Sequence, residues 1–419
     1  MRRPAPGRRG SKRVPAAGSR SPSAVAEWLL LVGLGLLLLV PHNLWVGLWE
    51  AGQPATDLAA VLLAALLALA AGRWGRRPWP RFWLPGAAFL GISLLSLAVN
   101  RVPAATAAAG LRETLPYVAL GLLAGRFLAP AGARRLAGWL VVLGGLVAVY
   151  GVSGYLAFRF LGGRRAIPPA PESAWLAALT YPYYCGHYLR GWRLVSTFMN
   201  DNYLGVWMAL TLPLGWVWTA AQPAGWRRRL GWLTLGLMVV ALTWTYSRGA
   251  ALAAVVSLGG LAARISWRAG WLLVPAVLAG LLMLTPADVV RFSNPGATEG
   301  NRVARLNLAG KDLARRPILG NGPGRGGLMD MQYGKVARET GLLGLGVFLW
   351  LLGAAVMGAW RGGGPWGAAI AFGLLGVAAA AIGGEDFENP QIAATFWLLA
   401  GMAPALAAGV DGGRREARA

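Results

Sequence analysis

Hydrophobic positions in this chain form long runs, and the short alternating stretches of a membrane β-barrel are not seen. The runs are about 17–20 residues long, which is enough for a helix to cross a bilayer. The pattern therefore predicts an all-α polytopic membrane protein. Twelve transmembrane helices are expected, at about 24–40, 57–72, 83–99, 114–128, 136–160, 202–221, 230–246, 249–265, 270–286, 338–359, 365–383 and 391–409.

Composition supports the membrane class and excludes some site chemistries. The chain is 56% hydrophobic and only 13% charged, whereas soluble proteins carry about 25% charged residues. The single cysteine, Cys185, excludes an intrachain disulfide and any site with several cysteine ligands. His42 and His187 are the only histidines, too few for a His-rich metal centre. We expect no metal and no cofactor.

The basic residues indicate how the chain crosses the membrane. With twelve spans, every second short connection is rich in arginine, and the short connections between them are nearly free of Lys and Arg. The positive-inside rule then places both termini in the cytoplasm. We expect a disordered basic N-terminus at 1–23, one transmembrane domain at 24–410 and a cytoplasmic tail at 411–419. The basic connections contain Arg73, Arg76, Arg77, Arg81, Arg134, Arg135, Arg227, Arg228, Arg229, Arg264, Arg268, Arg361, Arg414 and Arg415.

Two long outer loops, at about 161–201 and 287–337, are also basic. Long loops escape the orientation rule, so their charge indicates an anionic ligand. The second loop predicts an amphipathic helix at 301–316, followed by Pro317 and the glycine-rich GNGPGRGG. That run resembles a phosphate loop only weakly, because it lacks the Gly-Lys-Ser/Thr of nucleotide sites. The net charge of +24 is divided between the inner and outer segments, so nucleic-acid binding is not expected.

Arg248 lies within TYSRG, the expected outer turn between the spans 230–246 and 249–265. At that depth the guanidinium avoids the roughly 2.5–3.5 kcal/mol penalty of the bilayer centre. It also faces the same compartment as the two basic loops. Two readings stay open for Arg248, a role in binding an anion and simple extension to the membrane interface.

Four segments in order resemble the O-antigen ligase and O-antigen polymerase superfamily. They are an arginine-then-asparagine segment, a Ser-Arg-Gly hairpin, an arginine-bearing helix before Pro and Gly-x-Gly, and a Glu-x-Gly start of the next span. Together they cover about 190 to 360. The segments are RLVSTFMNDNYLGVWMALTLPL, TYSRGAALAAVVSL, NRVARLNLAGKDLARRPILGNGPGRGG and MDMQYGKVARETGLLGLGVFLWLL.

The resemblance implies a GT-C-like glycosyltransferase of the bacterial inner membrane, with its active site on the extracytoplasmic face. Such an enzyme transfers a glycan from an undecaprenyl-pyrophosphate carrier to a hydroxyl on a glycan, lipid or protein acceptor. Arginines would hold the diphosphate. On this basis we expect Arg193 and Arg302 to bind the diphosphate, and Arg305 is the alternative to Arg302. Arg248 would contact the diphosphate or order the loops.

The expected base differs from the family pattern. Family ligases carry a histidine about eleven residues before the glycine of the Glu-x-Gly motif, and that position here is Asp330. Asp330 is therefore the candidate base that activates the acceptor hydroxyl. Glu339 is a binding candidate or a carboxylate that favours a helix start. Asn200 and Asn202 bind substrate or cap the helix that follows them.

Two other classes of function compete with the enzyme. A transporter or flippase of anionic lipids would carry ionisable residues deep inside its spans. The sequence offers few of these; Arg112, Glu113 and Arg126 lie near expected span ends. A structural scaffold would explain the hydrophobicity but not the outer arginines.

Overall fold

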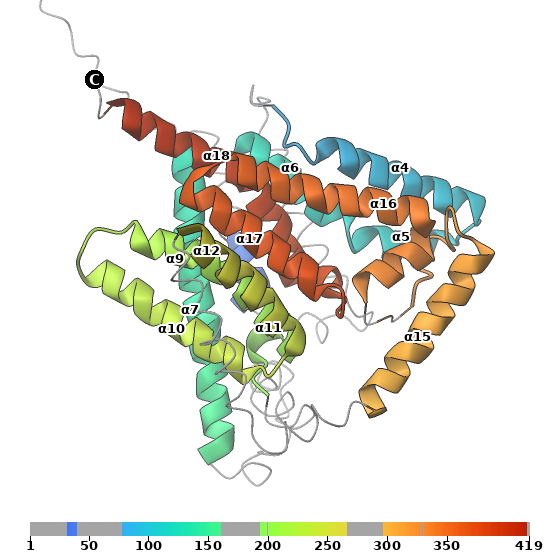
Figure 1. The fold of residues 1–419 in the computed structure, drawn as a ribbon, viewed down its shortest axis with the longest axis horizontal. Helices are drawn as coiled ribbons and strands as arrows, with labels where there is room; N and C mark the ends of the chain where they lie inside the picture. The colour runs from blue at the N-terminus through green and yellow to red at the C-terminus, as the bar shows by residue number, and fades with distance from the viewer. Residues whose placement is uncertain are drawn as a thin grey trace, which may run out of the picture.

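The computed structural model describes residues 32–39, 78–160, 193–198, 200–265, 296–327, 329 and 331–416. The described residues form helices and no strand (Figure 1), which confirms the all-helical class. The longer helices are α4 (Trp83–Val99), α6 (Leu115–Phe127), α7 (Pro130–Phe160), α9 (Asp201–Ala220), α10 (Trp226–Trp244), α15 (Gly296–Arg315), α16 (Gln332–Arg361), α17 (Gly364–Ala380) and α18 (Pro390–Glu416). The shorter helical segments are α5 (Ala104–Arg112), η2 (Ser196–Phe198), α11 (Arg248–Ala254), η3 (Val255–Gly259), α12 (Gly260–Ile265) and η4 (Asp386–Glu388).

Each predicted span that falls wholly within the described residues overlaps a helix or a run of helices. By length and composition, three of these helical stretches are suited to crossing a membrane: Pro130–Leu156, Arg248–Ile265 and Gln332–Arg361. The described part of the chain thus fits a helical membrane protein. The spans predicted at 57–72 and 270–286 lie outside the described residues, so the number twelve stays a prediction.

Two features of the helices differ from the sequence-based expectation. The helix predicted at 338–359 begins earlier, at Gln332, because its first turns pack against the glycine-rich loop and need no lipid. The short helix α5 was not predicted, since its alanine-rich sequence lies between two apolar runs and reads as a connection. The predicted amphipathic helix of the second outer loop is present as α15.

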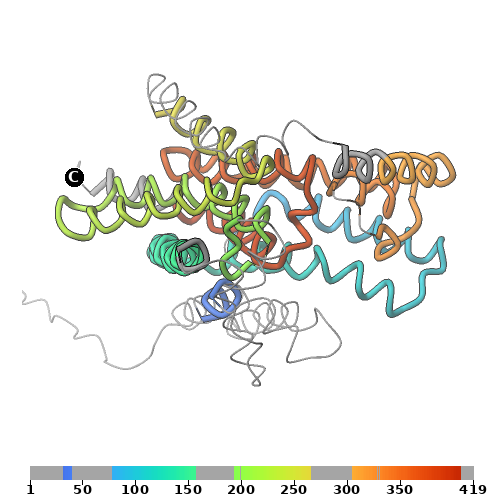
Figure 2. The backbone as a smooth tube through the Cα atoms, turned by 90° about the horizontal axis from the view of Figure 1, so that it is seen from below, coloured from blue at the N-terminus to red at the C-terminus, as the bar shows by residue number. Residues whose placement is uncertain are grey.

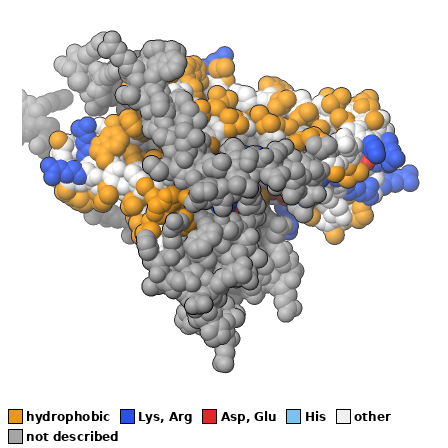
Figure 3. All heavy atoms as spheres, turned by 60° about the horizontal axis from the view of Figure 1, so that its bottom comes forward, with side chains coloured by type: hydrophobic (Ala, Val, Ile, Leu, Met, Phe, Trp, Pro, Cys, Tyr) orange, Lys and Arg blue, Asp and Glu red, His pale blue; other side chains and the backbone are white. Residues whose placement is uncertain are grey.

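The bundle core lies where α9, α17 and α18 pack together. Trp207 and Trp397 are among its largest fully buried side chains, and the Trp207 indole Nε1 donates to Thr395 Oγ1 at 2.9 Å. Large apolar side chains such as Leu349 and Trp350 are exposed on the outside of α16. Where Figure 3 shows described residues, hydrophobic side chains cover much of the surface and most of the Lys and Arg side chains lie toward its left and right ends.

Packing contacts define one end of the bundle, here called the loop end. α4 packs antiparallel to α16, since the rings of Phe89 and Phe348 lie 5.5 Å apart and Ser96 Oγ donates to Glu339 O at 3.1 Å. The end of α4 therefore meets the start of α16. Residues 37–38 connect η2 and the start of α18 at this end. Thr197 Oγ1 of η2 donates to Leu38 O, and Gln391 Nε2 of α18 donates to Leu37 O.

Candidate functional site

A break in α16 shapes the loop end. Gly341 has φ 72° and ψ −173°, a conformation that only glycine adopts readily. A Cβ at this position would lie 2.1 Å from the Ile318 carbonyl oxygen. The helix resumes at Leu342, whose N–H donates to Pro317 O at 2.8 Å. The break thus separates residues 332–340 from the apolar part of α16. The backbone of Pro317 and Ile318, just before the glycine-rich run, lies against the break.

Glu339 organises this loop. Its buried carboxylate Oε1 accepts hydrogen bonds from Gly324 N at 3.0 Å and Gly326 N at 3.1 Å. The backbone of α16 supplies two more acceptors, because Asn321 N donates to Arg338 O and Gly322 N donates to Glu339 O. These amide donors are engaged within the protein. The glycine-rich run is therefore a packed turn and not a cradle of free N–H groups for phosphate.

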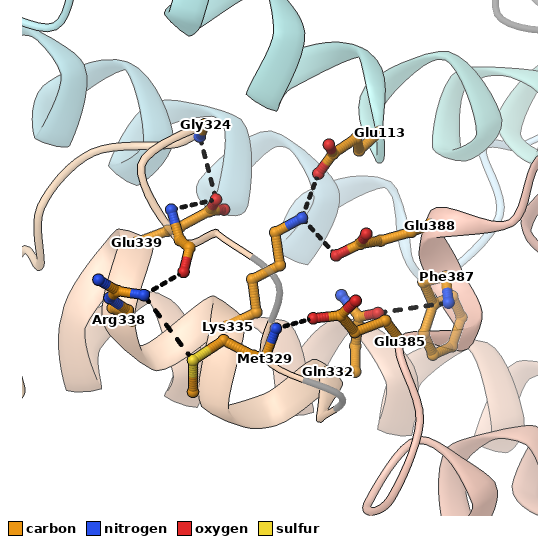
Figure 4. A network of polar contacts seen from close by, with 11 residues as sticks. Glu113, Gly324, Met329, Gln332, Lys335, Arg338, Glu339, Glu385, Phe387 and Glu388 are labelled. Atoms are coloured by element: carbon orange, nitrogen blue, oxygen red, sulfur yellow. Dashed lines mark hydrogen bonds and ion pairs between the residues drawn. The ribbon is translucent and has the colours of Figure 1, made fainter. Parts of the chain in front are cut away.

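Lys335 lies at the centre of a buried ionic cluster, which we call the Lys335 cluster. Its ammonium donates to Glu113 Oε2 at 2.7 Å and to Glu388 Oε1 (Figure 4). The Lys335 side chain is only 8% exposed. Glu113 precedes α6 and Glu388 ends η4, so one cation joins three parts of the chain that are far apart in sequence.

Neighbouring contacts extend the cluster on both sides. Arg338 Nε forms an ion pair with Asp312 Oδ2 of α15 at 2.6 Å. On the other side, Glu385 accepts a hydrogen bond from Met329 N, and Gln332 N donates to Gly384 O at 3.0 Å. The first turns of α16 therefore hold the glycine-rich turn and the connection between α17 and α18 in one arrangement (Figure 4). The ion pair of Arg338 adds α15 to it.

Burial changes the acidity of the carboxyl groups in the connection between α17 and α18. Burial raises the pKa of the Asp386 carboxyl to about 7. Burial also raises the pKa of the Glu388 carboxyl, to about 8. The Lys335 ammonium lowers this pKa but offsets only part of the effect of burial, and the charges of Glu385 and Glu113 raise it further. Near neutral pH this connection therefore carries less negative charge than its sequence suggests.

The structure brings Arg193 and Arg248 to the same corner of the loop end. Arg193 Nη1 forms an ion pair with the fully buried Asp201 Oδ2 at 2.5 Å. The next residue, Leu194, donates its N–H to Trp244 O at 2.9 Å, at the end of α10. Four residues later the exposed Arg248 begins α11. Asp201 thus fixes the direction of the Arg193 guanidinium beside the turn that carries Arg248.

The asparagine and serine residues at this corner cap helices. Asn200 Oδ1 accepts a hydrogen bond from Asn202 N at 2.9 Å and so caps α9. Ser247 Oγ caps α11 by accepting from Ala250 N at 3.2 Å. Of the two expectations for Asn200, capping is therefore present in the structure. Asn202 takes part through its backbone N–H.

Arg302 and Arg305 belong to a different helix from the other two arginines. Both are in α15, which packs along α16 on the side of the bundle away from α9 and α10 (Figure 2). Helical periodicity places positions 302, 305 and 309 on one face of α15, and Ala309 is buried. The helix α15, which carries both arginines, lies apart from the corner of Arg193 and Arg248.

Asp330, the predicted base, lies outside the described residues, as do His187 and most of the first outer loop. Sequence reasoning missed the Lys335 cluster. Its members are separated from Lys335 by 222 and 53 positions, so no local motif marks them. Within the described residues, no group of three or more His, Cys, Asp or Glu side chains is arranged to hold a metal ion.

Comparison of the sequence with known protein families and with curated proteins finds no match.

Proposed function

We propose that this protein is a membrane glycosyltransferase that moves a glycan from an undecaprenyl-pyrophosphate carrier to an acceptor hydroxyl, in the manner of an O-antigen ligase or polymerase. The observation that carries the proposal is the corner formed by Arg193 and Arg248 at one end of a bundle of apolar helices. A lipid diphosphate needs cationic groups at the edge of an apolar surface, and this corner offers two.

The proposed reaction requires charge stabilisation at the leaving group. The acceptor oxygen attacks the anomeric carbon, the bond from that carbon to the diphosphate oxygen breaks, and the electron pair leaves with the diphosphate. Guanidiniums held in place before the reaction stabilise this developing charge. Arginine suits the task because its planar fork binds two phosphate oxygens at once. Asp201 would keep Arg193 oriented. Arg302 and Arg305 lie on α15, apart from this corner, so their proposed role at the diphosphate requires α15 to approach α9 and α10 when the donor binds.

The proposed membrane arrangement has twelve spans, a GT-C-like fold and both termini in the cytoplasm. Exposed arginines at positions 227–229 lie at the start of α10, whereas Arg248 lies beyond its other end. In the proposed orientation the first group faces the cytoplasm and the loop end faces outward. Asp330 remains the proposed base, which would take the proton of the acceptor hydroxyl.

A transporter or flippase of anionic lipids is the second candidate, and the Lys335 cluster is the observation that favours it. Buried ionisable groups in a helical bundle often mark transport paths. However, Glu113 precedes a helix, Glu388 lies in a connection and Lys335 is in the first turn of α16. The cluster therefore belongs to helix ends and not to the middle of spans, which favours the enzyme.

Replacing Arg302 with alanine is expected to lower the yield of transferred glycan at least about hundredfold, because a positioned cation at the leaving group is lost. The yield is measured on blots of membranes, with the amount of protein in the membrane as reference. Arg315→Ala removes an exposed arginine from the end of the same helix and should leave the yield unchanged. Wild-type yield in Arg302→Ala would rule out this role for Arg302.

A further inference from the structure

Two arginine side chains meet at the end of α4. Arg316 Nη1 donates to Asn100 Oδ1, and Arg325 Nη1 lies 3.4 Å from the Asn100 carbonyl oxygen. The asparagine is itself fixed, because its Nδ2 donates to Gly320 O at 3.0 Å. Two guanidiniums, one from the residue after α15 and one from within the glycine-rich run, therefore converge on one residue.

The positive charge at this point is not offset within the described part of the chain. Neither Arg316 nor Arg325 forms an ion pair with a described residue, and both side chains are exposed. Each guanidinium has five N–H donors, of which the contact with Asn100 uses one. Asp312, the nearest acid in sequence to Arg316, is engaged by Arg338. Further exposed cations close in sequence to these residues are Arg101, Lys311 and Arg315.

An apolar surface leads up to this arginine pair. Val99 is the last residue of α4 and is 61% exposed. Ile318, between the two arginines in sequence, is 67% exposed, and Leu342, which donates to Pro317, is 55% exposed. Below them α4 and α16 pack together, with further exposed leucines on their outer sides. The two cations therefore lie at the edge of an exposed apolar surface.

We propose that Arg316 and Arg325 bind the phosphate of an anionic membrane phospholipid, such as phosphatidylglycerol, whose acyl chains lie on the apolar surface of α4 and α16. The planar guanidinium forks match phosphate oxygens, and the exposed apolar side chains match a lipid tail. This site is separate from the corner of Arg193 and Arg248, and it holds whether or not the protein transfers glycans.

The test titrates delipidated protein in detergent with phosphatidylglycerol and counts bound lipid by native mass spectrometry. Arg316→Gln together with Arg325→Gln is expected to weaken the tightest binding at least about tenfold, because basic residues near an anionic lipid each contribute about fivefold. Lys311→Gln together with Arg315→Gln removes the same charge from the same region without touching Asn100, and should leave that binding near wild type. Circular dichroism of both double variants checks that the helices are intact.

Three further probes identify the source of the phosphate. Phosphatidylcholine should bind more weakly because its net charge is zero, and inorganic phosphate should compete only at far higher concentrations because it lacks the tail. Equal loss of phosphatidylglycerol binding in the two double variants would overturn the proposal in favour of diffuse attraction. Unchanged binding in Arg316→Gln/Arg325→Gln would overturn it as well. Tight binding of undecaprenyl pyrophosphate without binding of phosphatidylglycerol would show that the site binds the lipid carrier of the glycan donor, and would overturn the phospholipid proposal.

Discussion

Replacing Lys335 with methionine is expected to lower the free energy of unfolding by about 2–4 kcal/mol, because it leaves the partly buried carboxyls of Glu113 and Glu388 without their buried cation. The loss should depend on pH. Without Lys335 the pKa of the Glu388 carboxyl, which burial already raises to about 8, rises further because the ammonium no longer lowers it. Below about pH 8 this carboxyl binds its proton in both folded proteins, so the variant loses stability relative to wild type as the pH rises above about 8 and recovers it as the pH falls.

Thermal unfolding of the purified protein in detergent on the two sides of the Glu388 pKa, about one unit below and about one unit above 8, measures this effect. Lys311→Met is the matched control, because Lys311 is exposed on α15. A second comparison adds Glu113→Gln and Glu388→Gln to Lys335→Met, and this neutral triple variant should regain part of the lost stability. Equal melting temperatures for Lys335→Met and wild type at the higher pH would show that the cluster does not stabilise the fold.

Replacing Gly341 with alanine is expected to destabilise the protein by at least about 3 kcal/mol. The backbone conformation at Gly341 alone disfavours other residues by about 1–3 kcal/mol. In addition, the new Cβ would overlap the Ile318 carbonyl oxygen, a backbone atom that cannot move without displacing the glycine-rich turn. The variant should melt at a lower temperature and accumulate less protein in the membrane.

Gly346→Ala supplies the control for this substitution. Gly346 belongs to the same helix, and a Cβ there would meet no atom within 4 Å. Alanine favours a helix interior over glycine, so this variant should be as stable as wild type or slightly more stable. If Gly341→Ala and Gly346→Ala had the same melting temperature, the break at Gly341 would not be a constraint on the fold.

The helices could be predicted from the sequence because each depends on a local run of apolar residues. The predicted span 83–99 coincides with α4 residue for residue, and 202–221 differs from α9 by one residue at each end. The break at Gly341 could not be predicted in this way. A glycine inside an apolar run is compatible with a continuous helix, and only the approach of Ile318 from the preceding loop makes the break necessary.

The site was predicted in part. The Ser-Arg-Gly turn was expected to carry Arg248 at the end of a helical hairpin, and the structure has it there with Ser247 as the cap. The hypothesis that Arg193, Arg248 and Arg302 meet around a diphosphate stays a prediction: Arg193 and Arg248 lie at one corner, whereas the helix of Arg302 lies apart from it. Arg302 lies on α15 along α16. The long-range partners of Lys335 and of Asn100 could not be predicted, because the residues that meet there belong to different segments and share no motif.

Incubation of the purified protein with an undecaprenyl-pyrophosphate glycan and an acceptor glycan tests the proposed function most directly. The products are separated by size and compared with those of Arg193→Ala, which removes the cation that Asp201 holds. A glycosyltransferase yields acceptor carrying one added block or a ladder of blocks, together with free undecaprenyl pyrophosphate, and the variant yields far less. If the wild-type protein leaves donor and acceptor unchanged but moves the donor across the bilayer of a liposome, it is a flippase and the proposed glycan transfer is wrong.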